Sequence, residues 1–262
     1  KNSKDQIKQF LENKGYYHAE VEDTVTFNRR NATVTYDIVF NDPYRVKSIS
    51  YHFEDTGIIS YVLPDTVNSL LKRGIRFDKD LLQQERARIE TRLKEEGYFS
   101  FSKEYIYYNA TVDPDAYAVH LSMHIDEYGQ GNPNPYTKVK FHPKYKINHV
   151  FIFPNYAETG LQHAVFDTLR FKNLNFLTLG EMNLKPNAIV NRNYIIPGEY
   201  YKLSNVNQTY RNLSALNIIR FTNITFKESD TLVTFGQQRY LDARIELNQR
   251  DLQALQAEIA GT

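Results

Sequence analysis

Alternating apolar and polar positions predict pairs of β-strands at three places in this 262-residue chain. Each place has two alternating segments joined by a short polar stretch, and the segments are residues 20–27 and 34–40, 101–109 and 117–125, and 220–227 and 240–247. Two such segments across a turn are typical of a β-hairpin. The pattern therefore predicts three hairpins.

The same helix signature precedes each hairpin. In residues 7–17, 89–99 and 209–219, a helical stretch carries a leucine, a helix-stopping residue stands four positions later, and two bulky residues follow. The stopping residues are Gly15, Gly97 and Asn217, of types that take the left-handed conformation beyond a helix end. We therefore expect three copies of a helix–hairpin repeat.

The second and third copies also share an opening. Residues 44–51 and 145–152 predict leading strands, and residues 64–72 and 185–193 predict a first helix. A turn ending in an aromatic residue follows, after which Asp78 and Ser204 are expected to cap the second helix. The complete unit is strand, helix, helix, strand, strand. For the second copy we expect one compact module with a core from Ile49, Tyr51, Leu70, Leu71, Ile89, Leu93, Phe99, Leu121 and Met123.

The repeat divides the chain into successive parts. We expect a truncated module in residues 1–42, a complete module in 43–127, a linker in 128–143, a third module in 144–250 with an insertion near 155–183, and a lead-out in 251–262. Gly and Pro residues between positions 129 and 135 predict the linker.

A tandem α+β unit of this order and size resembles the POTRA (polypeptide-transport-associated) domain. The motif that carries the likeness is Leu93, Gly97 and Phe99, preceded by Gly74 and Phe77. The resemblance implies modules with a three-stranded mixed sheet packed on two helices. It also implies the BamA/TamA group of outer-membrane protein assembly factors, in which such modules precede a membrane β-barrel. Two and a half modules before a barrel favour the TamA-like subgroup.

This resemblance implies a non-catalytic scaffold on the periplasmic side of the bacterial outer membrane, continuous with the β-barrel. Its partners would be unfolded outer-membrane proteins and other envelope assembly proteins. The family likeness places the first strand of each hairpin at a sheet edge, where a guest strand can pair by β-augmentation. The expected client-binding residues are Arg220, Phe221, Thr222, Asn223, Ile224, Thr225, Phe226, Phe101, Tyr105, Ile106 and Tyr107.

Charges on these strands leave an alternative open, because charged residues deter pairing at an edge. The charged residues that could block strand pairing in this way are Glu20, Glu22, Asp23, Lys103 and Glu104. A structural or adhesive envelope module without a transport role, or a cell-wall hydrolase, also stays open as a function.

Composition and motifs argue against several classes of function. A net charge of +1 argues against a dedicated nucleic-acid binder, and the lack of cysteine excludes disulfides and thiolate metal sites. His120 and His124 share a strand face but stand about 13 Å apart at strand rise, too far for one metal ion. The sequence contains no nucleophile elbow, no zinc-protease motif and no phosphate loop. We therefore expect that the protein is not an enzyme and binds neither a metal ion nor a cofactor.

Overall fold

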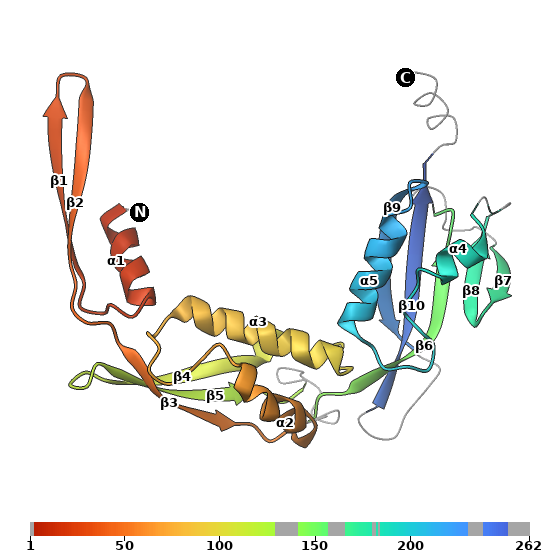
Figure 1. Cartoon of the computed structure of the whole chain (residues 1–262), viewed down its shortest axis with the longest axis horizontal. Helices are drawn as coiled ribbons and strands as arrows, with labels where there is room; N and C mark the ends of the chain where they lie inside the picture. The colour runs from red at the N-terminus through yellow and green to blue at the C-terminus, as the bar shows by residue number, and fades with distance from the viewer. Residues whose placement is uncertain are drawn as a thin grey trace, which may run out of the picture. The chain divides into compact units, whose positions relative to one another are not determined.

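The computed structural model describes residues 3–128, 141–156, 166–179, 182, 184–229 and 238–250. The chain divides into two compact units. Unit 1 comprises Lys1–Glu90 and Ser102–Phe141, and unit 2 comprises Thr91–Phe101 and His142–Thr262. Figure 1 labels the helices and strands of both units. No helix in the described ranges combines the length and apolar composition needed to cross a membrane.

Unit 1 begins with helix α1 (Ser3–Asn13) and a β-hairpin. Strands β1 (Glu20–Asn28) and β2 (Asn31–Val39) pair antiparallel along their whole length and form a two-stranded sheet. The turn between them contains Arg29 at φ 48°, the left-handed conformation that tight hairpin turns require. The first predicted hairpin is confirmed.

The main sheet of unit 1 has the strand order β3–β5–β4. Strand β3 (Arg45–His52) is parallel to β5 (Ala118–Ile125), and β4 (Ile106–Asp113) is antiparallel to it. Helix α3 (Lys79–Glu95) runs along one face of this sheet (Figure 1). The leading strand and the last strand of the predicted module therefore share one sheet, as expected.

Two local elements of unit 1 differ from their expected positions. The first helix, expected at residues 64–72, is α2 (Thr56–Val62), followed by the 3-10 helix η1 (Pro64–Asn68). It begins early because the Asp55 carboxylate accepts hydrogen bonds from the N–H groups of Gly57 and Ile58. The strand expected from residue 101 begins at Ile106.

A 3-10 helix, η2 (Lys103–Tyr105), takes the place of the first part of that strand. Its cap is Ser102, whose hydroxyl accepts a hydrogen bond of 3.3 Å from the N–H of Glu104. Local side-chain bonding of this kind competes with strand pairing. Phe101 and Tyr105 consequently lie outside β4.

The expected core of the second module is partly confirmed. Leu71, Ile89, Leu93, Leu121 and Met123 are buried. Ile49 and Tyr51 are only partly buried, and Leu70 is 39% exposed, because adjacent residues in this loop point to opposite sides and Leu71 takes the inward position. Phe99 packs instead against the core of unit 2.

Unit 2 has a five-stranded sheet of order β7–β8–β6–β10–β9. Its strands are β6 (Lys144–Phe153), β7 (Asp167–Phe171), β8 (Leu174–Thr178), β9 (Ile219–Glu228) and β10 (Gln238–Gln249). Three strands were expected. The other two form a hairpin within the predicted insertion, and Figure 1 shows this hairpin beside β6.

Helices α4 (Pro186–Val190) and α5 (Leu203–Ser214) complete unit 2. Asp78 caps α3 as expected, since its carboxylate accepts from the N–H of Asp80 at 2.9 Å. Ser204 is not a cap, because α5 starts one residue before it. Gly15 and Gly97 have φ of 87° and 101°, which confirms them as left-handed helix stops.

The third expected stop is wrong. Asn217 does not have a positive φ, and α5 ends with a right-handed Ala215 that donates to Arg211 and Leu213 carbonyls. The chain therefore leaves α5 without a left-handed residue.

Candidate functional site

Strand β9 lies at one edge of the unit 2 sheet, and β10 is the one strand of the described ranges that pairs with it. Its interior, from Phe221 to Phe226, carries no charged residue; Arg220 precedes this stretch and Lys227 follows it. The Phe221 side chain is 52% exposed. An edge with an uncharged interior and an exposed aromatic ring has the groups that a guest strand needs.

The inner face of β9 holds it to the unit 2 core. The Phe226 ring lies 5.5 Å from Phe99 and 5.4 Å from Tyr201, both in edge-on or tilted contacts. Ile224 packs against the same core, and Thr222 is 3% exposed. Burial raises the pKa of Tyr201 to about 12, so its hydroxyl stays neutral at physiological pH. Three of the seven predicted β9 residues therefore anchor the strand rather than face a guest.

Of the remaining predicted residues of β9, Asn223 contributes to its pairing with β10. Its amide donates to the Glu246 carboxylate at 2.9 Å, and the Arg244 guanidinium bonds to the same carboxylate. Arg244 in turn lies 4.2 Å from the Phe153 ring centroid. Arg220 and Thr225 are exposed.

Strand β4 is the corresponding edge of unit 1. Tyr107 is 43% exposed, whereas Ile106 is fully buried and serves the core. The expected blunting charges lie before the strand, where the Arg86 guanidinium binds the Glu104 carboxylate at 2.9 Å and the Lys103 carbonyl. Strand β4 therefore has no charged residue before Asp113 at its end.

Phe101 and Tyr105 are removed from the candidate edge by the late start of β4. Phe101 is 1% exposed and lies 5.0 Å from the His142 ring within unit 2. Tyr105 closes η2, and burial raises the pKa of its hydroxyl. Strand β1, by contrast, does carry its expected charges Glu20, Glu22 and Asp23 within the paired region.

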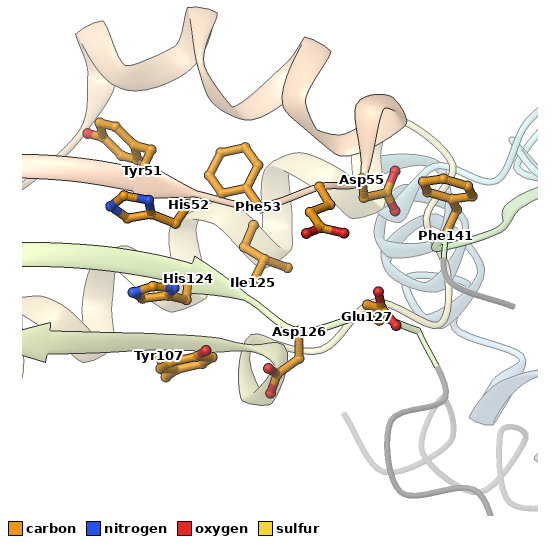
Figure 2. A pocket seen from close by; sticks show the side chains of 11 residues that line it. Tyr51, His52, Phe53, Asp55, Tyr107, His124, Ile125, Asp126, Glu127 and Phe141 are labelled. Atoms are coloured by element: carbon orange, nitrogen blue, oxygen red, sulfur yellow. The ribbon is translucent and has the colours of Figure 1, made fainter. Parts of the chain in front are cut away.

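A cleft of about 710 Å³ lies at one end of the unit 1 sheet, and sequence reasoning missed it. Figure 2 shows rings from three strands across it: Tyr107 stacks on His124 at 4.9 Å, and His124 on His52 at 5.1 Å. The carboxylates of Glu54, Asp55, Asp126 and Glu127 also line the cleft. Ring faces and carboxylates both attract cations.

The cleft offers no assembled metal centre. In the described ranges, no three His, Asp or Glu residues are placed to hold a metal ion together. The Asp55 carboxylate is engaged in capping α2. The strand register β3–β5–β4 brings the three rings together, and this register is not visible in the local sequence.

Comparison with known proteins gives a structural likeness only. The chain is similar to POTRA domains 3–5 of Haemophilus influenzae BamA, with a TM-score of 0.50 and 12% identity over 92% of this chain and 76% of that chain. It is also similar to a Haemophilus ducreyi BamA lacking POTRA domains 1–3, with a TM-score of 0.50 and 10% identity over 79% of this chain and 30% of that chain. No protein-family model and no curated protein matches the sequence.

The fold is thus that of tandem POTRA domains, and the expected α+β class is confirmed. Identities this low establish fold and do not by themselves establish what the chain binds.

Proposed function

We propose that this chain is a strand-accepting arm of an outer-membrane protein assembly factor, acting without catalysis on the periplasmic side of the membrane. Its POTRA fold supports the proposal, because BamA carries the same fold in the solved structures. The observation that carries it is the position of β9 and β4 at sheet edges with uncharged interiors. The matched structures give no preference to the TamA-like subgroup.

The proposed partners are unfolded outer-membrane proteins. Backbone N–H and C=O groups on an edge pair with a guest strand whatever its side chains. An assembly factor with many clients needs that tolerance. Affinity is expected to be weak, because the guest loses conformational entropy when it becomes ordered.

Proline scanning of β9 tests this proposal. Along an antiparallel edge strand, successive N–H groups alternate between the partner strand and the open side. Of Thr222→Pro and Asn223→Pro, one therefore removes an outward donor and leaves the ladder to β10 intact. Thermal unfolding identifies that variant by its near-native stability.

Client binding is then measured with a fluorescent ten-residue peptide of alternating apolar and polar residues, by anisotropy. We expect the stable variant to bind about tenfold more weakly, the equivalent of about one or two lost hydrogen bonds. Thr111→Pro and Thr225→Pro extend the scan to β4 and to the far end of β9. If every stable proline variant binds the peptide like the unchanged chain, pairing at these edges is wrong.

A further inference from the structure

Strands β3 and β6 occupy equivalent places in the two units. Each is parallel to the last strand of its module. The N–H of Val46 donates to the Ile75 carbonyl at 2.9 Å, and the N–H of Ile147 donates to the Glu199 carbonyl at 2.8 Å. Each leading strand also carries one extra residue just after this point, relative to its partner. Val46 and Ile147 are therefore matching positions.

The outer sides of these two strands differ. The outer side of β6 is occupied by β8, which pairs with it in parallel: Phe151 faces Asn175 and Ile152 faces Phe176. The first part of β3 bonds on its outer side to residues 74–77, and among the described residues no strand pairs with that side from Ser48 onward. Counting from the matching positions, Ser50 and Tyr51 correspond to Phe151 and Ile152.

Burial shows what the added strand contributes. Leu174 and Phe176 of β8 point into the unit 2 core and are 4% and 0% exposed. Beside them on the neighbouring strand β6, Val150 and Ile152 are fully buried. The matching residues of β3, Ile49 and Tyr51, are only partly buried. Apolar surface left partly exposed beside an edge strand is stabilised when a further strand covers it.

Residues 48–52 of β3 have none of the features that usually block pairing at a sheet edge. The charged residues of β3, Arg45 and Lys47, precede the stretch 48–52, which reads Ser-Ile-Ser-Tyr-His and contains no proline. Natural edges are usually blunted by charge, proline or a bulge. The bulge here lies before Ser48, where Val46 and Ser48 pair with adjacent residues of β5.

We infer that the free edge of β3 is a second strand-binding site, which takes an extended client segment in parallel orientation, as β8 is held on β6. The guest places two large apolar residues, two positions apart, beside Ile49 and Tyr51 on the same sheet face, following the Leu174 and Phe176 pattern. A polar residue between them faces Ser50. This inference rests on the proposed function for the nature of its guest, and it names a different edge and the opposite strand polarity.

Disulfide trapping tests it cleanly, because the chain contains no cysteine. The full chain carries Ser50→Cys, and the probe is a synthetic peptide of residues 172–179 with cysteine in place of Asn175. The Phe151–Asn175 register predicts that these two thiols face each other. Docking raises their local concentration, so we expect crosslinking at least about tenfold faster than for a non-docking control. The same peptide with asparagine restored competes, and a version with its apolar and polar positions exchanged does not.

The matched control is Ser122→Cys in the central strand β5. Ser122 lies on the same face, with its hydroxyl 3.0 Å from that of Ser50, but on a strand already paired on both sides. Equal crosslinking at Ser50→Cys and Ser122→Cys means that the peptide lies on the sheet face, which overturns the inference. The Ser50→Cys, Asn175→Cys double variant tests whether a second copy of the chain is the occupant. If it forms a covalent dimer that added peptide does not prevent, a second copy occupies the β3 edge, and this result also overturns the inference.

A Thr225→Cys variant separates this inference from the proposed function. Crosslinking at Thr225→Cys without crosslinking at Ser50→Cys rejects the β3 site and leaves the β9 edge standing. Crosslinking at Ser50→Cys alone supports the β3 site and rejects β9. Slow crosslinking at both positions rejects both.

Discussion

The backbone N–H of Tyr44 donates a hydrogen bond of 2.9 Å to the carbonyl oxygen of Gly15, the residue at which α1 stops. Gly97 and Tyr145 make the same bond at the same length. In both cases an aromatic residue two positions after the glycine packs on that tyrosine: Tyr17 on Tyr44 at 5.3 Å, and Phe99 on Tyr145 at 5.5 Å. Each helix stop is therefore bonded to the leading strand that follows it in the sequence.

Gly15→Ala should destabilise unit 1 strongly. A Cβ at Gly15 would stand 2.6 Å from the Phe77 carbonyl oxygen, and the φ of 87° is unfavourable for any other residue. Gly74→Ala is the matched control, since Gly74 has φ 84° with open space around it. We expect about 1 kcal/mol for the control and at least about 2 kcal/mol for Gly15→Ala, measured by chemical unfolding. Equal losses would mean that the close approach to Phe77 contributes nothing.

Glu95→Gln should destabilise unit 2 through helix α5. The α5 cap residue, Lys202, makes no side-chain hydrogen bond. The Glu95 carboxylate instead accepts from the N–H and the hydroxyl of Ser204, each at 2.6 Å, and a carboxylate also suits the positive end of a helix. We expect a loss of about 0.5–2 kcal/mol.

Glu96→Gln is the control for that substitution. Glu96 pairs with Arg92 one turn away on the helix surface, where such a pair contributes about 0.3–0.5 kcal/mol. Thermal unfolding of both variants measures the two losses of stability. If Glu95→Gln costs no more than Glu96→Gln, the carboxylate does not act as the cap of α5.

The repeat itself could be predicted from the sequence because its signals are local. The spacing of Leu93, Gly97 and Phe99 depends on helix periodicity and one left-handed residue, and both are present in the structure. The parallel pairing of β8 with β6 could not be predicted, because residues 174–178 bear no local mark of the strand they join. The expected start of β4 is a 3-10 helix in the structure, because the Ser102 hydroxyl accepts a hydrogen bond from the N–H of Glu104. The edge positions of β4 and β9 agree with the family likeness, but the anchoring of β9 by Phe99 and Tyr201 depends on tertiary contacts.

The stability of unit 1 should fall in acid through Glu85. This carboxyl is 3% exposed; burial raises its pKa, but hydrogen bonds from Arg88 and from the N–H of Leu70 outweigh burial and lower the pKa overall. A lowered folded-state pKa stabilises the fold above the unfolded value of about 4.3 and loses that contribution as the pH falls through the folded value. The free energy of unfolding should therefore decrease below about pH 4.5.

Glu85→Gln should flatten that pH dependence and cost about 1–3 kcal/mol at neutral pH, because the Arg88 guanidinium loses a charged partner. Asp65 also pairs with Arg88 and keeps it from being isolated. Glu104→Gln, at an exposed pair with Arg86, should change neither the stability nor its pH profile measurably. Urea unfolding between pH 3 and 7 distinguishes the two; parallel profiles for the unchanged chain and Glu85→Gln would exclude Glu85 as the titrating group.

Thr222→Val should leave the stability of unit 2 unchanged or raise it by up to about 1 kcal/mol, because the Thr222 hydroxyl is buried without a hydrogen-bond partner among the described residues. Thr209→Val is the matched opposite: that hydroxyl is also buried, but it accepts from the N–H of Tyr194 and donates to the Asn205 carbonyl, each at 2.8 Å. Its removal takes the acceptor away from the Tyr194 N–H and should cost about 1–3 kcal/mol. Because valine keeps the β9 backbone intact, Thr222→Val should also bind the client peptide normally, unlike a proline that removes the outward donor. A marked loss of stability in Thr222→Val would mean that the hydroxyl has a partner; lost peptide binding with stability retained would mean that side chains, rather than the backbone, select the guest.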